Sequence, residues 1–131
     1  MSKRALIVDD TELNRKLAIA ILRREGWEAE QVACGKAALA LLREDCNFDI
    51  VLLDIRMPDM SGEEVCSTLR ADPRTATIPL IAYTAHALED ELQGFRDIGF
   101  NEVLVKPTNV EAMRAALAKV LALPGRPEEQ G

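Results

Sequence analysis

Four short apolar runs of the sequence each lead into polar or charged residues that could take part in metal or phosphate chemistry. These residues are Asp9 and Asp10, Asp54, Thr84 and Lys106. Carboxylate oxygens are ligands that Mg²⁺ prefers, whereas a hydroxyl and an ammonium can both donate to phosphoryl oxygens. A carboxylate can also act as the nucleophile of a covalent transfer. Brought together, these side chains could bind a divalent cation and accept a phosphoryl group.

The charges of this set favour a bound cation. Three carboxylates crowded at one place repel one another unless positive charge lies between them. Asp9, Asp10 and Asp54 contribute −3 and Lys106 contributes +1, so a Mg²⁺ ion would make the site neutral. An acyl phosphate on Asp54 would carry a charge of about −2, and its oxygens would need the cation, Lys106 and Thr84 as partners.

Each of these residues also has a purely structural interpretation. Asp9 and Asp10 could cap the helix that follows them or interact with its dipole, and Asp54 could cap a loop. Thr84 could cap another helix, and Lys106 could extend from the end of a strand to solvent. It is the joint occurrence of all five residues that favours a functional site.

The elements that must position these residues follow from the pattern of apolar residues. Strands are predicted at five short apolar runs, residues 5–8, 29–33, 50–53, 80–83 and 103–105. Helices are predicted where apolar residues recur three or four positions apart, at Leu13, Leu17, Ala20 and Ile21; Ala38, Leu41 and Leu42; Val65 and Leu69; Leu88, Leu92 and Phe95; and Val110, Met113, Leu117 and Leu121. The expected helix boundaries are Gly26, Ser61-Gly62, Asp72-Pro73, Gly99 and Pro107-Thr108-Asn109.

Regular alternation of strands and helices predicts an α/β fold with a doubly wound parallel sheet and helices on both faces. The run 50–53 is apolar throughout, as expected of a strand covered on both faces. Charged residues interrupt the run 29–33, which we therefore place at an edge of the sheet. Ligands of such sheets bind at the carboxyl ends of the strands, where all the residues of the set are expected.

The composition limits the class of protein. With 131 residues, 48% of them hydrophobic, the chain is long enough for one domain with a substantial core. A net charge of −6 argues against direct binding to nucleic acid or to an anionic membrane. Cys34, Cys46 and Cys66 lack metal-ligand spacing and are expected to be reduced, and the first apolar run is too short for a signal peptide or membrane span. We expect a cytoplasmic protein with one domain over residues 1–122 and a flexible tail over residues 123–131.

Four stretches of the sequence carry a joint and specific resemblance to a known family. They are LIVDD at residues 6–10, VLLDIRMPDMSG at 51–62, IPLIAYTA at 78–85 and KP at 106–107. Over residues 3–121 the sequence resembles the receiver domain of two-component response regulators. The resemblance implies a flavodoxin-like (βα)5 fold whose strand order is 2-1-3-4-5.

The resemblance also implies a role for each residue of the set. Asp54 would accept a phosphoryl group from a phosphohistidine. Mg²⁺, with Mn²⁺ as an alternative, would be held by Asp9, Asp10, Asp54 and the backbone carbonyl of Arg56. The phosphoryl group would be bound, and the switch formed, by Thr84, Ala85 and Lys106, with a cis peptide bond between Lys106 and Pro107.

As a function, the resemblance implies a signalling switch that catalyses its own phosphorylation and slow dephosphorylation, rather than an enzyme with a separate substrate. The phosphodonor would be a sensor histidine kinase or a histidine phosphotransferase. Phosphorylation would change the surface formed by the fourth helix, fifth strand and fifth helix, to which a downstream protein would bind. The start at Met1 and the short tail favour a stand-alone receiver of the chemotaxis or cell-cycle type, with no output domain, that is a monomer or a weak, phosphorylation-dependent dimer.

Three positions bear on how such a switch would work here. The family usually has a Tyr or Phe three residues before the lysine, and this chain has Val103, so rotation of an aromatic ring at that position cannot be the readout. Arg56 and His86 match positions that tune the hydrolysis of the acyl phosphate in the family. For His86, a solvated residue at the start of a helix is favoured over a metal ligand or a phosphodonor.

Two other kinds of protein share part of this pattern. A haloacid-dehalogenase-type phosphatase also uses an aspartyl nucleophile and Mg²⁺, but it needs an acid two residues after the nucleophile, where this chain has Arg56. A flavodoxin-like FMN protein needs phosphate donors after the first strand and aromatic residues over the flavin. The loop here offers two aspartates, and aromatic residues are only 4% of the chain.

Overall fold

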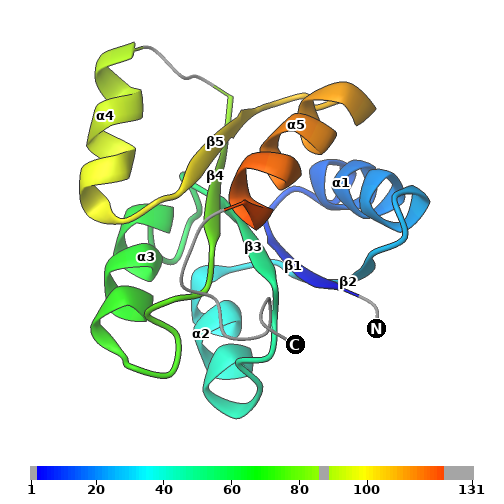
Figure 1. Ribbon diagram of the computed structural model, residues 1–131. Coiled ribbons are helices and arrows are strands. Elements are labelled where there is room, and N and C mark those ends of the chain that lie inside the picture. Colours follow the sequence, from blue (N-terminus) through cyan, green and yellow to red (C-terminus); the bar gives the residue numbers. More distant parts are fainter. Residues whose placement is uncertain (1–2, 86–88, 123–131) are drawn as a thin grey trace.

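The computed structural model describes residues 3–85 and 89–122, in which five strands and five helices alternate along the chain (Figure 1). The strands are β1 (Arg4–Val8), β2 (Glu28–Val32), β3 (Ile50–Asp54), β4 (Leu80–Thr84) and β5 (Glu102–Val105). The helices are α1 (Glu12–Arg24), α2 (Gly35–Glu44), α3 (Gly62–Ala71), α4 (Glu89–Ile98) and α5 (Val110–Leu121). Each predicted strand is confirmed to within one residue at either end. His86, Leu88 and the predicted tail, residues 123–131, lie outside the described residues.

The strands form one parallel sheet in the order β2-β1-β3-β4-β5, as the family resemblance implied. The third strand, β3, is central and β1 lies beside it, and the chain reverses its direction of winding between β1 and β3. The strand β2 lies at an edge and has three exposed residues out of five, which confirms the position expected from its charged residues. The carboxyl ends of β1 and β3, which are neighbours, therefore lie side by side.

Helices cover both faces of the sheet, with α1 and α5 on one face and α2, α3 and α4 on the other (Figure 1). Two separate apolar clusters result, because alternate residues of each strand point to opposite faces. In β3, for example, Leu52 belongs to the cluster under α1 and α5, whereas Leu53 belongs to the cluster under α2, α3 and α4. The same alternation determines which side chains at the carboxyl ends of the strands point to the same face of the sheet.

The helix boundaries follow from local side-chain and backbone chemistry. Ser61 caps α3, and its hydroxyl and the Glu64 carboxylate form a reciprocal capping box. Asn109 caps α5 by accepting a hydrogen bond from the Ala112 amide at 2.8 Å. Gly26, just after α1, has a φ of 89°, which favours glycine over residues with a side chain.

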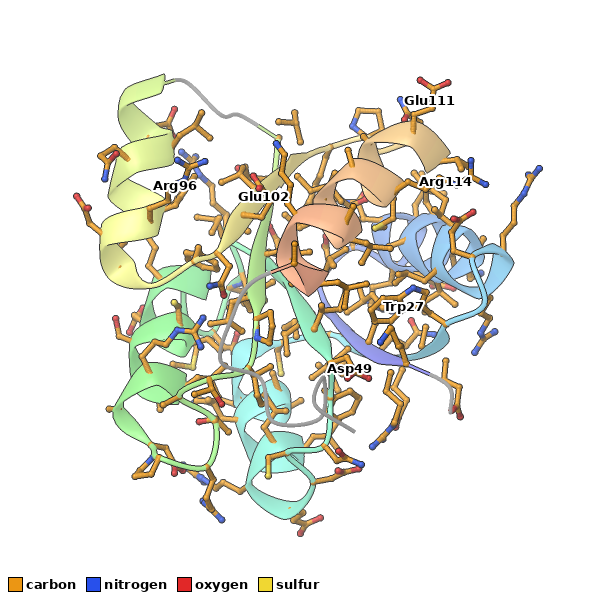
Figure 2. All side chains as sticks on the ribbon, in the orientation of Figure 1. Trp27, Asp49, Arg96, Glu102, Glu111 and Arg114 are labelled. Atoms are coloured by element: carbon orange, nitrogen blue, oxygen red, sulfur yellow. The ribbon has the colours of Figure 1, made fainter. Side chains whose placement is uncertain are left out.

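On the face covered by α1 and α5, a buried aromatic residue and an ion pair lie at the end of α1. Trp27 is only 8% exposed and packs in the cluster under these two helices (Figure 2). Arg114 of α5 contacts Glu25 at the end of α1, with 2.7 Å between Nε and Oε1. Both contacts link α5 to the segment at the end of α1.

The three cysteines are free thiols, as expected from their spacing. Among residues 3–85 and 89–122, none of the helices has the length and apolarity needed to cross a membrane.

Candidate functional site

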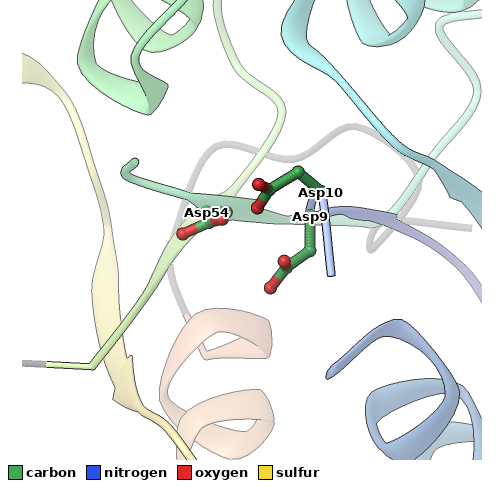
Figure 3. A group of neighbouring side chains, drawn as sticks. All are labelled: Asp9, Asp10 and Asp54. Atoms are coloured by element: carbon green, nitrogen blue, oxygen red, sulfur yellow. The ribbon is translucent and has the colours of Figure 1, made fainter. Parts of the chain in front are cut away.

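The carboxylates of Asp9, Asp10 and Asp54 gather at the carboxyl end of the sheet (Figure 3). Asp9 and Asp10 follow β1 directly, and Asp54 is the last residue of β3. One oxygen of each carboxylate lies within 4.8 Å of the others. Asp9 and Asp54 are buried and Asp10 is exposed, so one side of this carboxylate cluster is open to water. Hard divalent cations bind oxygen ligands of this kind and retain several waters.

The two oxygens of Asp9 have different partners. Oδ1 accepts a hydrogen bond from the Thr11 amide at 2.8 Å, so part of the structural interpretation of Asp9 is correct. Oδ2 is buried and, among the described residues, accepts no hydrogen bond of normal geometry. It lies 2.7 Å from Lys106 Nζ, in an ion pair whose angles are not those of a hydrogen bond. A cation bound within the carboxylate cluster would give this buried oxygen a further partner.

Lys106 bridges two of the three acids. Its Nζ atom lies 2.7 Å from Asp9 Oδ2 and 3.0 Å from Asp54 Oδ1, and its side chain is only 13% exposed. The Lys106–Pro107 peptide bond is cis. One ammonium balances one of the three negative charges, so the cluster keeps an excess of negative charge that a divalent cation would neutralise.

Burial dominates the ionisation of Asp54. It raises the pKa of this carboxyl from an ordinary value of 3.8 to about 6, because the charged form loses water. The Lys106 ammonium opposes the shift, and the Asp9 carboxylate adds to it. The Arg56 amide also donates to Asp54 Oδ1, at 3.3 Å. Another positive charge beside Asp54 would favour the ionised form, which is the form that can act as a nucleophile.

The loop between β3 and α3 approaches Asp54 closely and requires a glycine. A Cβ atom on Gly62 would lie 2.2 Å from the Asp54 carbonyl oxygen and 2.9 Å from Ile55 Cα. The Gly62 amide donates to the Ile55 carbonyl at 2.9 Å, and this contact closes the loop. Farther along the loop, Asp59 accepts hydrogen bonds from the first amides of α2, those of Gly35 and Lys36, at 3.2 and 2.9 Å. The loop that follows Asp54 is thus attached to the first turn of α2 and leads directly into α3.

A cavity of about 750 Å³ lies beside the carboxylate cluster. Of the residues predicted from the sequence, it is lined by Asp10, Asp54, Arg56, Thr84, Ala85 and Lys106. Glu91 and Phe95 of α4 also line it, so the cavity reaches from the end of β1 to α4. Of the other predicted residues, Asp9 and Pro107 are not among the described residues that line the cavity, and His86 lies outside the described residues. The carboxyl ends of four strands, together with α3 and α4, therefore contribute to one hollow large enough for a hydrated cation and a phosphoryl group.

Tyr83 is a part of the site that the sequence analysis missed. Its side chain is fully buried, and Lys106 Nζ lies over its ring, 5.0 Å from the ring centre. Burial and the neighbouring Asp9 and Asp54 charges raise the pKa of its hydroxyl to about 12. The available signal was a polar group within the apolar run 80–83, one residue before Thr84. The contact of Tyr83 with Lys106 depends on the position of β4 between β3 and β5, and the apolar run alone does not predict that strand order.

Comparison with known proteins decides which family has this arrangement. The sequence pattern of the response regulator receiver domain matches residues 5–118. The chain belongs to the response regulator receiver family. Membership identifies residues 5–118 as a receiver domain of two-component signalling, as the motif stretches indicated.

Curated relatives place the receiver domain in two different settings. The chain is 38% identical over 115 residues to the aerobic respiration control sensor protein ArcB of Escherichia coli, a match that covers 87% of this chain and 14% of ArcB. It is 37% identical over 110 residues to the polar-differentiation response regulator DivK of Brucella ovis, covering 84% of this chain and 89% of DivK. This receiver domain therefore spans a small part of one relative and most of the other.

Solved receiver structures have the same fold. The chemotaxis protein CheY4 of Vibrio cholerae is 29% identical with a TM-score of 0.85, over 92% of this chain and 99% of that protein. A CheY-like receiver domain from Methylobacillus flagellatus is 26% identical with a TM-score of 0.81, over 92% and 99%. Both confirm the flavodoxin-like fold.

Proposed function

We propose that Asp54 is the phosphoacceptor of this receiver domain and takes its phosphoryl group from a phosphohistidine on a sensor kinase or a histidine phosphotransferase. The observation that carries this proposal is the position of Asp54 at the end of β3, paired with Lys106 and within 4.8 Å of two more acids. The Asp54 side chain is only 6% exposed, so its access to phosphodonor is through the neighbouring cavity.

The same residues support a magnesium site. Asp9, Asp10 and Asp54 would supply carboxylate oxygens, and the Arg56 carbonyl would supply one more from the loop after β3. Bound Mg²⁺, or Mn²⁺ in its place, would lower the charge on the transferring phosphoryl oxygens and favour ionised Asp54. The buried Asp9 Oδ2 and the open side of the cluster at Asp10 fit such an ion.

The covalent step needs an in-line nucleophile and charge neutralisation, and little else. An ionised Asp54 oxygen attacks phosphorus while the bond from phosphorus to the imidazole nitrogen breaks, and the electron pair of that bond stays on the imidazole. The product is an acyl phosphate on Asp54. Lys106 already contacts Asp54, and it turns to the new phosphoryl oxygens with only a small movement. In a slow second reaction water attacks the same phosphorus, the bond from phosphorus to the Asp54 oxygen breaks, and inorganic phosphate leaves while the Asp54 carboxylate is restored.

Thr84 and Ala85 connect this chemistry to the surface of the domain. Both line the cavity, and Thr84 ends β4 next to β5. We infer that the new phosphoryl oxygens draw the Thr84 hydroxyl toward Asp54 and thereby change the surface of α4, β5 and α5, to which a downstream protein binds. Val103 packs in the apolar cluster under α4, so this readout relies on the loop after β4 and not on a ring at that position.

Two variants test the assignment of Asp54. Asp54→Asn removes the nucleophile and keeps the shape of the side chain, so we expect it to abolish labelling by a phosphorylated histidine phosphodonor in the presence of Mg²⁺. Asp97→Asn makes the same chemical change at an exposed position of α4 and should be labelled like the wild type. Labelling of Asp54→Asn at the wild-type level would refute the assignment.

A further inference from the structure

The ring of Tyr83 lies between the strand that carries Lys106 and the strand that carries Asp54. In the sheet, β4 separates β3 from β5, and Tyr83 is paired with Asp54 on one side and with Leu104 on the other. Lys106 therefore reaches Asp54 and Asp9 only by crossing β4. The residue of β4 at that level is Tyr83.

Side-chain alternation places all four groups on one face of the sheet. Tyr83 belongs to the cluster under α1 and α5, as does Leu104, two residues before Lys106. Asp9 and Asp54 likewise follow, by two residues, Ile7 and Leu52 of that cluster. The Lys106 side chain thus runs over the face of the Tyr83 ring, with Nζ 5.0 Å from the ring centre.

Three contacts then define where the Lys106 ammonium can lie. The carboxylates of Asp9 and Asp54 attract it at 2.7 and 3.0 Å, and the negative face of the aromatic ring attracts it from below. With the Lys106 side chain 13% exposed and Tyr83 fully buried, water weakens this attraction little. The ring would still attract the ammonium when the carboxylates bind a cation or, at Asp54, a phosphoryl group.

We propose that Tyr83 is a positioning residue for Lys106, whose ammonium it holds at the level of Asp54 so that the ammonium meets the incoming phosphoryl oxygens. The inference rests on the proposed role of Asp54. It assigns the function to the aromatic ring, because the Lys106 ammonium lies over the face of that ring. Transfer to Asp54 then proceeds with the ammonium already in place, and less ordering is needed at the moment of reaction.

Phosphorylation by acetyl phosphate in the presence of Mg²⁺ tests this inference without a protein partner. In this reaction an Asp54 oxygen bonds to phosphorus and acetate leaves with the electrons of the broken bond. Tyr83→Met replaces the ring with a flexible apolar chain, and we expect it to slow labelling about fivefold, within the range of a shielded cation–π contact. The conservative variant Tyr83→Phe keeps the ring and should restore labelling to within twofold of the wild-type rate.

A double-mutant cycle separates positioning from a general effect on packing. In a Lys106→Met background, Tyr83→Met should change the residual labelling rate less than twofold, because the group that the ring holds is absent. A fivefold loss that persists in this background would overturn the inference. So would a Tyr83→Met rate equal to that of the wild type, or a Tyr83→Phe rate as low as that of Tyr83→Met.

Proton NMR of the unphosphorylated protein gives a test that is independent of labelling. The Lys106 side-chain protons should be shifted upfield by the ring of Tyr83 in the wild type and in Tyr83→Phe. Random-coil shifts for these protons in the wild type would overturn the inference. Wild-type protein that shows the ring shift but accepts no phosphoryl group would instead contradict the proposed function of Asp54.

Discussion

At the scale of single residues, one ammonium faces more negative charge than it can balance. Lys106 contacts Asp9 and Asp54, and Asp10 adds a third carboxylate from the exposed side. Like charges this close raise the free energy of the site unless a cation lies between them. The contribution of each acid can be tested separately, because they differ in burial and in partners.

Asp10→Ala removes the exposed carboxylate of the cluster. We expect Mg²⁺ affinity, measured by calorimetry, to fall by about tenfold or more, because the ion loses one of its few protein ligands. The thermal unfolding temperature should stay close to that of the wild type, since the Asp10 side chain is exposed. Asp97→Ala is the control, and it should bind Mg²⁺ like the wild type. An unchanged affinity in Asp10→Ala would exclude this residue from the metal site.

The raised pKa of Asp54 predicts an unusual dependence of stability on pH. The folded protein holds the proton of this carboxyl more tightly than the unfolded chain does, so ionisation costs stability as the pH rises from about 4 to about 6. Asp54→Asn removes this cost. In Mg²⁺-free buffer above pH 6, we expect the variant to be more stable than the wild type by about 1–3 kcal/mol. The difference should disappear near pH 4. Equal denaturation curves for both proteins at pH 7 would contradict the shift.

At the scale of elements, the segment from β3 to α3 holds Asp54 in place by close backbone contact. The first residue of α3, Gly62, lies against the last residue of β3, and the Ser61 cap starts the helix at that point. Asp59 links the same loop to the first turn of α2. The site therefore depends on the geometry of a loop as much as on its acids.

Gly62→Ala tests this dependence. The added Cβ atom would lie 2.2 Å from the Asp54 carbonyl oxygen, and backbone atoms must move to relieve the overlap. We expect a loss of about 1–3 kcal/mol in the free energy of unfolding, together with slower phosphorylation.

Gly94→Ala is the matched control, since a Cβ atom there has no neighbour within 4 Å. Placed inside α4, this substitution should stabilise the protein by about 0.5–1 kcal/mol. If denaturant unfolding gives the same change in the free energy of unfolding for Gly62→Ala and Gly94→Ala, the close approach at Gly62 does not constrain the site.

At the scale of the whole molecule, the pattern of apolar residues was sufficient to predict the elements and the layers. Strands covered on both faces are continuous apolar segments, such as residues 50–53, and are easily found. The charged residues of β2 likewise indicated an edge. The gathering of Asp9, Asp10 and Asp54 followed from the rule that the carboxyl ends of parallel strands meet at one edge. The strand order itself came from the resemblance to receiver domains.

Contacts between distant segments could not be predicted in this way. Tyr83 lies under Lys106 only because β4 separates β3 from β5, which is a property of the strand order. The guanidinium of Arg70 donates to the carbonyl oxygens of Ala76, Ile78 and Gly99, and so joins α3 to the start of β4 and the end of α4. Neither residue has a neighbour in sequence that indicates its partners. Such contacts depend on where the elements pack, and periodicity does not contain that information.

The central claim, that the phosphoryl group is carried by Asp54, is tested most directly by locating the modified residue. Borohydride reduces an aspartyl phosphate to homoserine, which keeps the record of the modified position. After phosphotransfer from a histidine phosphodonor and reduction, peptide mass spectrometry should find homoserine at position 54 and at no other aspartate. Homoserine at Asp9 or Asp10, or a phosphoryl group on a residue of another type, would contradict the account.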